Sequence, residues 1–180
     1  MAHRGHSVRV LTTDPEWREL RSPPTQDSGR DPHIRWLATY TDRSKSGIKR
    51  MVNYLSYSAA SSWARRFTAS ADVTYVYATQ MTAGIAADIN KYLSGTPFVL
   101  HVQDVWPDSV TGSGMAGPRR VSDLIGFVLN PWVSYMYKRA DAVVAISPEM
   151  RKLLIDRGSD PHRTFSVYNW ARPESPRDAN

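Results

Sequence analysis

Residues Ala140 to Gly158 read ADAVVAISPEMRKLLIDRG, and this stretch decides the fold class. Its first part, Ala140 to Ile146, is a short apolar run of the kind found in buried β-strands. Ser147–Glu149 then supplies a helix N-cap, a proline suited to the first helical position and an acid in the first turn. Gly158 follows the helical segment, as a C-terminal glycine commonly does. The stretch therefore predicts a strand followed directly by a helix, which is the repeating unit of a parallel α/β sheet.

Five further runs rich in β-branched and aromatic residues predict the other strands of this sheet. They are Val8–Thr13, Ile34–Tyr40, Val73–Thr79, Pro97–Gln103 and Thr164–Tyr168. Apolar residues three and four positions apart predict one helix within residues 48–67 and another within residues 121–136. This alternation predicts a Rossmann-like, doubly wound parallel sheet formed by residues 1–170, with residues 171–180 as a linker or tail.

The composition is that of a globular chain. It has 180 residues, of which 41% are hydrophobic and 22% charged, so a disordered chain is excluded. No apolar run approaches the roughly 18 residues that a spanning helix needs, and no leader segment opens the sequence. The absence of cysteine excludes a disulfide framework, a zinc-thiolate site and a cysteine nucleophile. We expect a cytoplasmic protein.

The chain carries 23 basic and 17 acidic residues, and part of this excess flanks the helix predicted over residues 48–67. The basic residues there are Lys45, Lys49, Arg50, Arg65 and Arg66. One interpretation is a helix packed on the sheet with a solvated basic rim, and another is peripheral contact with an anionic membrane at the inner face of the cell membrane. A third, nucleic-acid binding, is the least favoured of the three, and we expect no nucleic-acid partner.

One familiar motif is misleading here. Gly112–Gly117 matches GxGxxG, but the dinucleotide fingerprint must follow its strand directly and open a helix, whereas the preceding strand is predicted to end near Gln103. We therefore interpret Ser109–Arg120, like Ser22–His33, as a long loop. The five histidines show no metal-binding spacing, so no metal site is expected. GxSxG and GxxxxGK[ST] motifs are absent, which removes the usual hydrolase and P-loop signatures.

The carboxyl ends of parallel strands are where such sheets bind ligands. His101–Ser109, which reads HVQDVWPDS, is the densest group of polar side chains at a predicted strand end. A carboxylate and an indole together suit a sugar, because hydroxyls bond to the acid while the C–H face of the ring lies on the aromatic. The candidate catalytic residues are Asp104 and His101, and the candidate binding residues at strand ends are Thr79, Gln80, Gln103, Trp106, Asp108, Ser109 and Asn169.

A purely structural interpretation of the same residues remains open. Asp104 would cap the turn that leaves the strand, and Trp106 would pack under the loop. Asp108 with Ser109 would begin a helix.

In order along the chain, several segments resemble one family. They are RGHSVRVLTT at residues 4–13, YVYATQMTAG at 75–84, HVQDVWPDS at 101–109, the strand and helix of 140–158, and FSVYNW at 165–170. The series resembles the N-terminal domain of family 4 glycosyltransferases of the GT-B fold, and it is similar to the WbuB-like group that builds bacterial surface polysaccharide. The resemblance covers essentially the whole chain.

The resemblance implies retaining, metal-independent transfer of a sugar from a nucleoside-diphosphate donor, without a cofactor, to an acceptor that is often a polyprenyl-linked saccharide. This half would bind the acceptor, and the C-terminal half would bind the donor. Arg50 and Tyr54 would face the acceptor or the lipid. The family's first strand with its glycine-rich loop, expected before Met1, and its donor-binding domain with paired glutamates are not found in this sequence. We therefore expect that the chain alone transfers no sugar.

Two alternatives of different classes remain. The first is a non-catalytic Rossmann-like binding module that associates with a partner or a membrane. The second is one half of a sugar-nucleotide epimerase, because those enzymes share the two-domain architecture.

Overall fold

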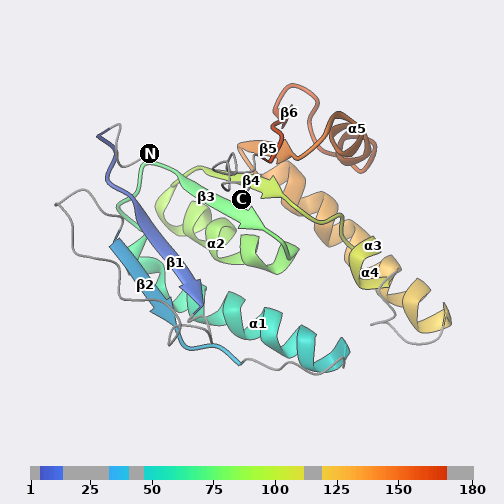
Figure 1. The fold of residues 1–180 in the computed structure, drawn as a ribbon, viewed down its shortest axis with the longest axis horizontal. Helices are drawn as coiled ribbons and strands as arrows, with labels where there is room; N and C mark the ends of the chain where they lie inside the picture. Colours follow the sequence, from blue (N-terminus) through green and yellow to red (C-terminus); the bar gives the residue numbers. More distant parts are fainter. Residues whose placement is uncertain (1–4, 14–32, 41–46, 112–118, 170–180) are drawn as a thin grey trace, which may run out of the picture.

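The computed structural model describes residues 5–13, 33–40, 47–111 and 119–169 (Figure 1). The strands are β1 (Arg9–Thr13), β2 (His33–Leu37), β3 (Thr74–Ala78), β4 (Phe98–Val102), β5 (Ala142–Ala145) and β6 (Thr164–Ser166). The α-helices are α1 (Gly47–Trp63), α2 (Ile85–Ser94), α3 (Asp108–Thr111), α4 (Arg119–Arg139) and α5 (Pro148–Asp156). Two short 3-10 helices are η3 (Ala64–Phe67) and η4 (Met81–Gly84).

All strand pairs described are parallel. β1 pairs with β2, and β3, β4, β5 and β6 form a second sheet in that order. The six strands predicted from the sequence are all present, with bounds shifted by a few residues. The predicted parallel α/β fold of Rossmann type is therefore confirmed. The loop predicted over Ser22–His33, the GxGxxG segment 112–117 and the tail 171–180 lie wholly or almost wholly outside the described residues.

The core lies on one face of the four-stranded sheet. Val76, Leu100 and Val143 share that face and are 7%, 0% and 1% exposed. Buried residues of α2, α4 and α5 belong to the same cluster, and Met51 and Tyr54 of α1 pack against it. Each connection from β3 through β6 moves to the next strand in the same direction, so right-handed crossovers place their helices on the same side.

Helix α5 forms as its sequence predicts. Ser147 is the N-cap, and its hydroxyl accepts a hydrogen bond of 3.1 Å from the backbone amide of Met150. Pro148 occupies the first helical turn, where no intrahelical donor is required. Gly158 follows the helix with φ +97°, a conformation that L residues rarely adopt. These interactions fix both ends of the helix and hold the segment that follows β5.

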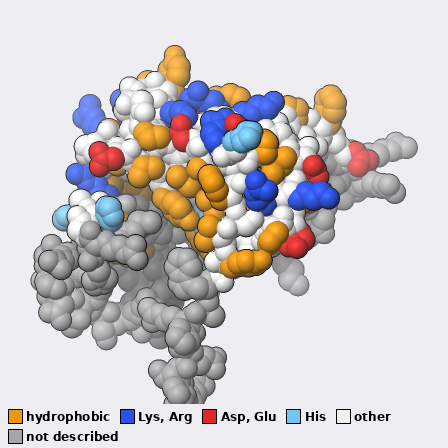
Figure 2. Space-filling model, turned by 90° about the horizontal axis from the view of Figure 1, so that it is seen from above, with side chains coloured by type: hydrophobic (Ala, Val, Ile, Leu, Met, Phe, Trp, Pro, Cys, Tyr) orange, Lys and Arg blue, Asp and Glu red, His pale blue; other side chains and the backbone are white. Residues whose placement is uncertain are grey.

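The described surface carries many large hydrophobic side chains. Figure 2 shows hydrophobic side chains gathered in the middle of the face seen from above, with lysines and arginines around them. Tyr75, Tyr77 and Phe165 lie on the sheet face opposite the core and are 49%, 56% and 51% exposed. None of the described helices combines the length and the apolar composition needed to cross a bilayer.

Candidate functional site

The loop after β4 is anchored by Trp106. This indole is 2% exposed, and its ring lies 5.8 Å from that of Tyr54 on α1 and 6.5 Å from that of Trp132 on α4. Tilted and edge-on aromatic pairs at these separations are favourable packing arrangements. Trp106 therefore packs beneath the loop, which agrees with the structural interpretation of this residue.

Arg157, at the C-terminus of α5, holds the same loop from the other side. Its Nη1 donates a hydrogen bond of 2.9 Å to the carbonyl oxygen of Trp106, and its Nη2 donates to the Oδ2 of Asp108. Asp108 begins α3, also in agreement with the structural interpretation, and the amide of Ser109 bonds to the Val105 carbonyl at 2.9 Å. Sequence reasoning missed Arg157, because it looks like an ordinary residue of a last helical turn.

His101 lies within the sheet rather than at its rim. It is 5% exposed, its Nδ1 forms a hydrogen bond of 2.5 Å with the Tyr75 hydroxyl, and the ring of Tyr77 meets its ring edge-on. Burial lowers the pKa of His101 below its usual range. Burial likewise raises the pKa of the Tyr75 phenol. The lowered pKa favours the neutral imidazole, which is hydrogen-bonded to Tyr75 and flanked by Tyr77.

Gln103 joins the ends of two strands. Its Oε1 accepts a hydrogen bond of 2.8 Å from the Nδ2 of Asn169, which follows β6. The backbone N–H of Gln103 donates a hydrogen bond of 2.9 Å to the carbonyl oxygen of Ala78, which brings the end of β4 beside the end of β3. Thr79 and Gln80 continue from Ala78, and they are exposed and half-buried respectively. The structure thus brings these residues together at one edge of the sheet.

The candidate residues form two clusters separated by the end of β4. His101 and Gln103 alternate onto the face that carries Tyr75 and Tyr77, and Asn169 joins them; we call these three residues the sheet-face cluster. Trp106, Asp108 and Ser109 form the helix-side cluster. Trp106 of this cluster contacts Trp132 through its ring and Arg157 through its carbonyl oxygen.

Asp104 lies between the two clusters, in the bend after β4, with its side chain exposed. Arg50 is exposed in the first turn of α1, whose N-terminus lies toward the edge where β3 and β4 end (Figure 1).

Several buried polar atoms of this region have no hydrogen-bond partner. They are the Nε2 of His101, the Nε2 of Gln103 and the Oγ of Ser109. Buried polar atoms in proteins are nearly always paired with protein or water, because an unpaired one costs about 1–3 kcal/mol. Atoms of the same kind also occur in Thr74, Thr82, Asn90 and Tyr137, so they do not single out residues 101–109 as a ligand site. Among the described residues, no three His, Asp or Glu side chains gather as a metal site would require.

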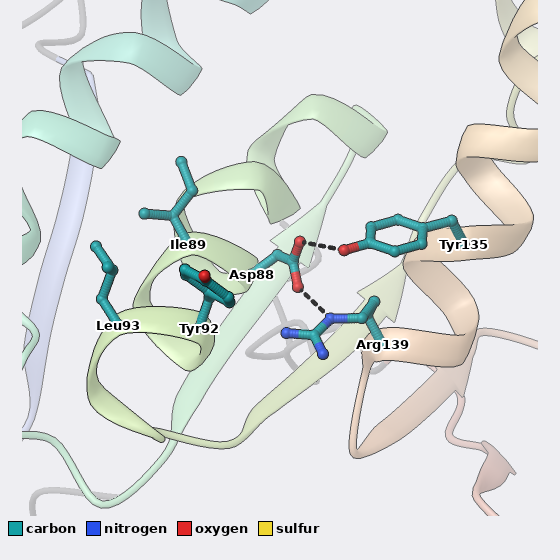
Figure 3. A pocket seen from close by; sticks show the side chains of 6 residues that line it. All are labelled: Asp88, Ile89, Tyr92, Leu93, Tyr135 and Arg139. Carbon is teal, nitrogen blue, oxygen red and sulfur yellow. Dashed lines mark hydrogen bonds and ion pairs between the residues drawn. The ribbon is translucent and has the colours of Figure 1, made fainter.

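A separate hollow lies between α2 and α4, with a volume of about 440 Å³ (Figure 3). Within it the Nε of Arg139 donates to the Oδ1 of Asp88 at 2.7 Å, and the hydroxyl of Tyr135 donates to Oδ2 at 3.2 Å. Tyr92 and Leu93 of α2 line the same space (Figure 3). The hollow contains none of the predicted site residues, and its charged groups are already paired with each other.

Comparison with known proteins defines the class. The model of the glycosyl transferase 4-like domain matches residues 1–170, and the chain belongs to this family. This confirms the resemblance found in the sequence.

The chain is 25% identical, over 95% of its length, to the putative colanic acid biosynthesis glycosyl transferase WcaI of Escherichia coli, and it covers 44% of that protein. It is 30% identical, over 45% of its length, to the probable glycosyltransferase WbjE of Pseudomonas aeruginosa, and it covers 20% of it. Among solved structures it is similar to Anabaena HepE in complex with UDP and glucose, with a TM-score of 0.47, 15% identity, and coverage of 78% of this chain and 32% of that one. The chain thus spans less than half the length of the curated relatives it matches.

Proposed function

We propose that this chain is the acceptor-binding part of a glycosyltransferase of surface polysaccharide synthesis, which moves a sugar from a nucleoside-diphosphate donor to a polyprenyl-linked saccharide. The observation that carries the proposal is the edge where β3, β4 and β6 end, with Asp104 exposed between two clusters of polar and aromatic side chains. Membership of the glycosyl transferase 4-like domain family supports the reaction class. In a parallel sheet, this edge is where a ligand binds.

In this proposal Asp104 accepts a hydrogen bond from an acceptor hydroxyl, because it is the exposed carboxylate at the end of β4. Gln103 and Asn169 hold the ends of β4 and β6 together, and the exposed Asn169 offers its amide oxygen to a further hydroxyl. Thr79, Gln80 and Asp108 border the same edge, and Arg50 approaches it from α1. His101, which the sequence predicts to be catalytic, is buried and hydrogen-bonded to Tyr75, so in this proposal it supports β4 and does not contact the acceptor.

The transfer itself needs a donor-binding domain, which the proposal places in another part of the protein. The bond between the anomeric carbon of the donor and its diphosphate oxygen breaks, and a bond from that carbon to an acceptor oxygen forms on the same face of the sugar. The diphosphate leaves with the electron pair and takes the proton that the acceptor hydroxyl gives up. The chain alone is therefore proposed to be inactive.

A transfer assay tests this proposal. The purified chain is given radiolabelled UDP-glucose, UDP-N-acetylglucosamine or GDP-mannose, with bacterial lipid-linked saccharides as the acceptor source. We expect no transfer by the chain alone, and transfer once it is joined to the donor-binding half of a relative. In the joined protein Asp104→Asn is expected to lower kcat/KM about a hundredfold or more, as loss of a group that contacts a reacting hydroxyl does.

The matched control is Asp72→Asn. Asp72 is also an exposed aspartate, but it precedes β3 and so lies at the amino-terminal ends of the strands, away from the candidate site. Its activity should equal that of the unaltered joined protein. Sugar transfer by the chain alone, or equal losses in the two variants, would contradict the proposal.

A further inference from the structure

Helix α4 is apolar on two opposite sides. Its inner side contacts the core through Val133, Met136 and Tyr137, each of which is 1% exposed. On its outer side Phe127 and Val128 are 78% and 61% exposed. A helix on the surface of a globular protein normally carries charged or polar residues on its outer side. The outer side of α4 therefore has the composition of a surface that is covered.

The exposed apolar side chains of α4 form one line along the helix. Their spacing places them on the same side of it. They are Leu124, Phe127, Val128, Pro131 and Tyr135, and we call them the α4 ridge. At a rise of 1.5 Å per residue the ridge is about 16 Å long. Figure 1 shows the N-terminal half of α4, in yellow, at the edge of the molecule, where a second molecule can reach it.

A hollow lies beside the C-terminal end of the α4 ridge. It is the space of about 440 Å³ between α2 and α4, and Tyr135 of the ridge lines it together with Tyr92 and Leu93 (Figure 3). Tyr92 and Leu93 are 82% and 53% exposed. The Asp88 carboxylate in the hollow is already paired with Arg139. The hollow therefore offers aromatic and apolar surface to an inserted side chain, as the pockets of protein interfaces do.

The charges at the two ends of the α4 ridge have opposite signs. Asp123 is exposed next to Leu124, and Lys138 is exposed three residues after Tyr135. Neither of these charged side chains forms an ion pair with another residue that the structure describes. At 3.6 residues per turn they lie about 60° apart around the helix axis, and so on the same flank of the ridge. An antiparallel helix of the same sequence would present a base to the acid and an acid to the base.

We propose that the α4 ridge is the interface of a two-fold symmetric dimer of this chain, in which the two α4 helices pack antiparallel. A two-fold axis beside Pro131 places Phe127 opposite the partner's Tyr135, because each lies four residues from Pro131. Phe127 of each copy then enters the hollow of the other. Asp123 lies eight residues from Pro131 and Lys138 lies seven, so the same axis brings Asp123 to the partner's Lys138.

A second copy of the chain accounts for the ridge, the hollow and the charges together. A lipid surface or another domain would also cover the apolar side chains. Neither would explain why the exposed phenylalanine and the hollow, and likewise the acid and the base, are placed symmetrically about one point of the helix. In a two-fold interface every contact occurs twice, so a modest surface ion pair contributes twice. The inference does not depend on the proposed function, because association is measured without any sugar.

Sedimentation equilibrium of the purified chain over a range of concentrations tests the proposal. We expect a reversible equilibrium between monomer and dimer. Phe127→Ser should raise the dissociation constant of the dimer about tenfold or more, because two phenyl rings would no longer be removed from water. Val128→Asp is a second disruptive variant, and circular dichroism checks that both variants fold. The matched control is Phe165→Ser on β6, which is 51% exposed on the sheet face opposite the core and should dimerise as the unaltered chain does.

Charge reversal tests which ends of the two helices meet. Asp123→Lys and Lys138→Asp alone should each raise the dissociation constant about threefold or more, since like charges would then face each other twice. The variant with both substitutions should associate nearly as the unaltered chain does. The proposal is overturned if the chain stays monomeric, if Phe127→Ser associates as tightly as the unaltered chain, or if the double charge variant associates no better than the single ones. A monomer would leave the ridge to another part of the protein or to a lipid surface.

Discussion

Arg157 connects the C-terminus of α5 to the loop that carries the candidate site. Its two hydrogen bonds reach the Trp106 carbonyl and the Asp108 carboxylate, and its side chain is 25% exposed. We expect Arg157→Ala to lower the free energy of unfolding by about 1–3 kcal/mol, since hydrogen bonds to charged groups contribute amounts of this order. Urea unfolding followed by fluorescence measures this change.

Arg163 provides the matched control for that prediction. It pairs with Asp160 at 3.0 Å, but the two side chains are 45% and 37% exposed. Surface ion pairs of this kind contribute little, so Arg163→Ala should change stability by no more than about 0.5 kcal/mol. Equal effects of the two substitutions would show that Arg157 does not hold the loop.

His101 gives stability a pH dependence. Burial lowers the pKa of its imidazole below the value of about 6.5 expected in the unfolded chain. Between these two values the unfolded chain binds more protons, so the free energy of unfolding rises with pH. The part of the free energy of unfolding that depends on a neutral His101 is fully present above about pH 6.5. It is lost as the pH falls through the pKa of His101 in the folded protein.

Replacing His101 by asparagine should remove this slope in the pH range just below about 6.5, the ordinary pKa of histidine. The lowered pKa values of Asp141 and Asp160 act in more acidic solution, below about pH 4, and do not overlap this range. Urea unfolding at a series of pH values measures the slope. An unchanged slope in the variant would mean that another group causes it.

The contrast between Asp104 and Trp106 shows what sequence reasoning can reach at the level of single residues. HVQDVWPDS at a strand end predicts a site there, and the structure places its Asp104 exposed and its Trp106 buried. The side on which Trp106 lies depends on Tyr54 and Trp132, which come from distant parts of the chain. Arg157 was unpredictable for the same reason, since its partners are more than 40 residues away.

Among the helices, the end of α5 depends on a glycine. Gly158 has φ +97°, and a Cβ there would lie 2.6 Å from the Ser134 hydroxyl of α4. Gly95, after α2, has φ +71° but no atom within 4 Å of such a Cβ. Both alanine substitutions meet the left-handed backbone cost of about 1–2 kcal/mol.

Gly158→Ala should therefore destabilise the protein more than Gly95→Ala, by about 1 kcal/mol or more, because it adds a clash with α4. Chemical denaturation of the two variants under identical conditions provides the comparison. If both lose the same stability, the close approach of α5 to α4 at Gly158 is not maintained in solution.

Local signals account for which elements the sequence could predict. Helix α5 has an N-cap, a proline and a terminal glycine within one short stretch, and it was predicted with its bounds. Helix α2 was missed, because its N-cap is Gly84 without a side-chain hydrogen bond and its large residues Tyr92 and Leu93 face solvent. The left-handed Gly95 and Lys91 in the last turn were the available signals. For α1 the spacing predicts a helix but not the side that faces the interior. On that side Ser58 and Ser61 are buried, and the Ser58 hydroxyl donates a hydrogen bond to the Thr82 carbonyl.

At the scale of the whole molecule, strand order came from contacts that no local pattern encodes. The sequence predicted six parallel strands, and the structure divides the described ones into β1–β2 and β3–β6. Within the described residues, β1 and β3 each pair along one edge only. Open edges of this kind can accept another strand. The additional strand expected from the family resemblance stays a prediction.

The central claim is that this chain binds a saccharide where β3, β4 and β6 end, and leaves the donor nucleotide to another domain. Chemical-shift mapping by NMR, with simple methyl pyranosides and then with UDP as ligands, tests it most directly. The account predicts that a saccharide shifts the amide signals of residues 101–109 and of Asn169, and that UDP shifts none of them. Saccharide-induced shifts confined to the hollow between α2 and α4, or tight binding of UDP at the end of β4, would contradict it.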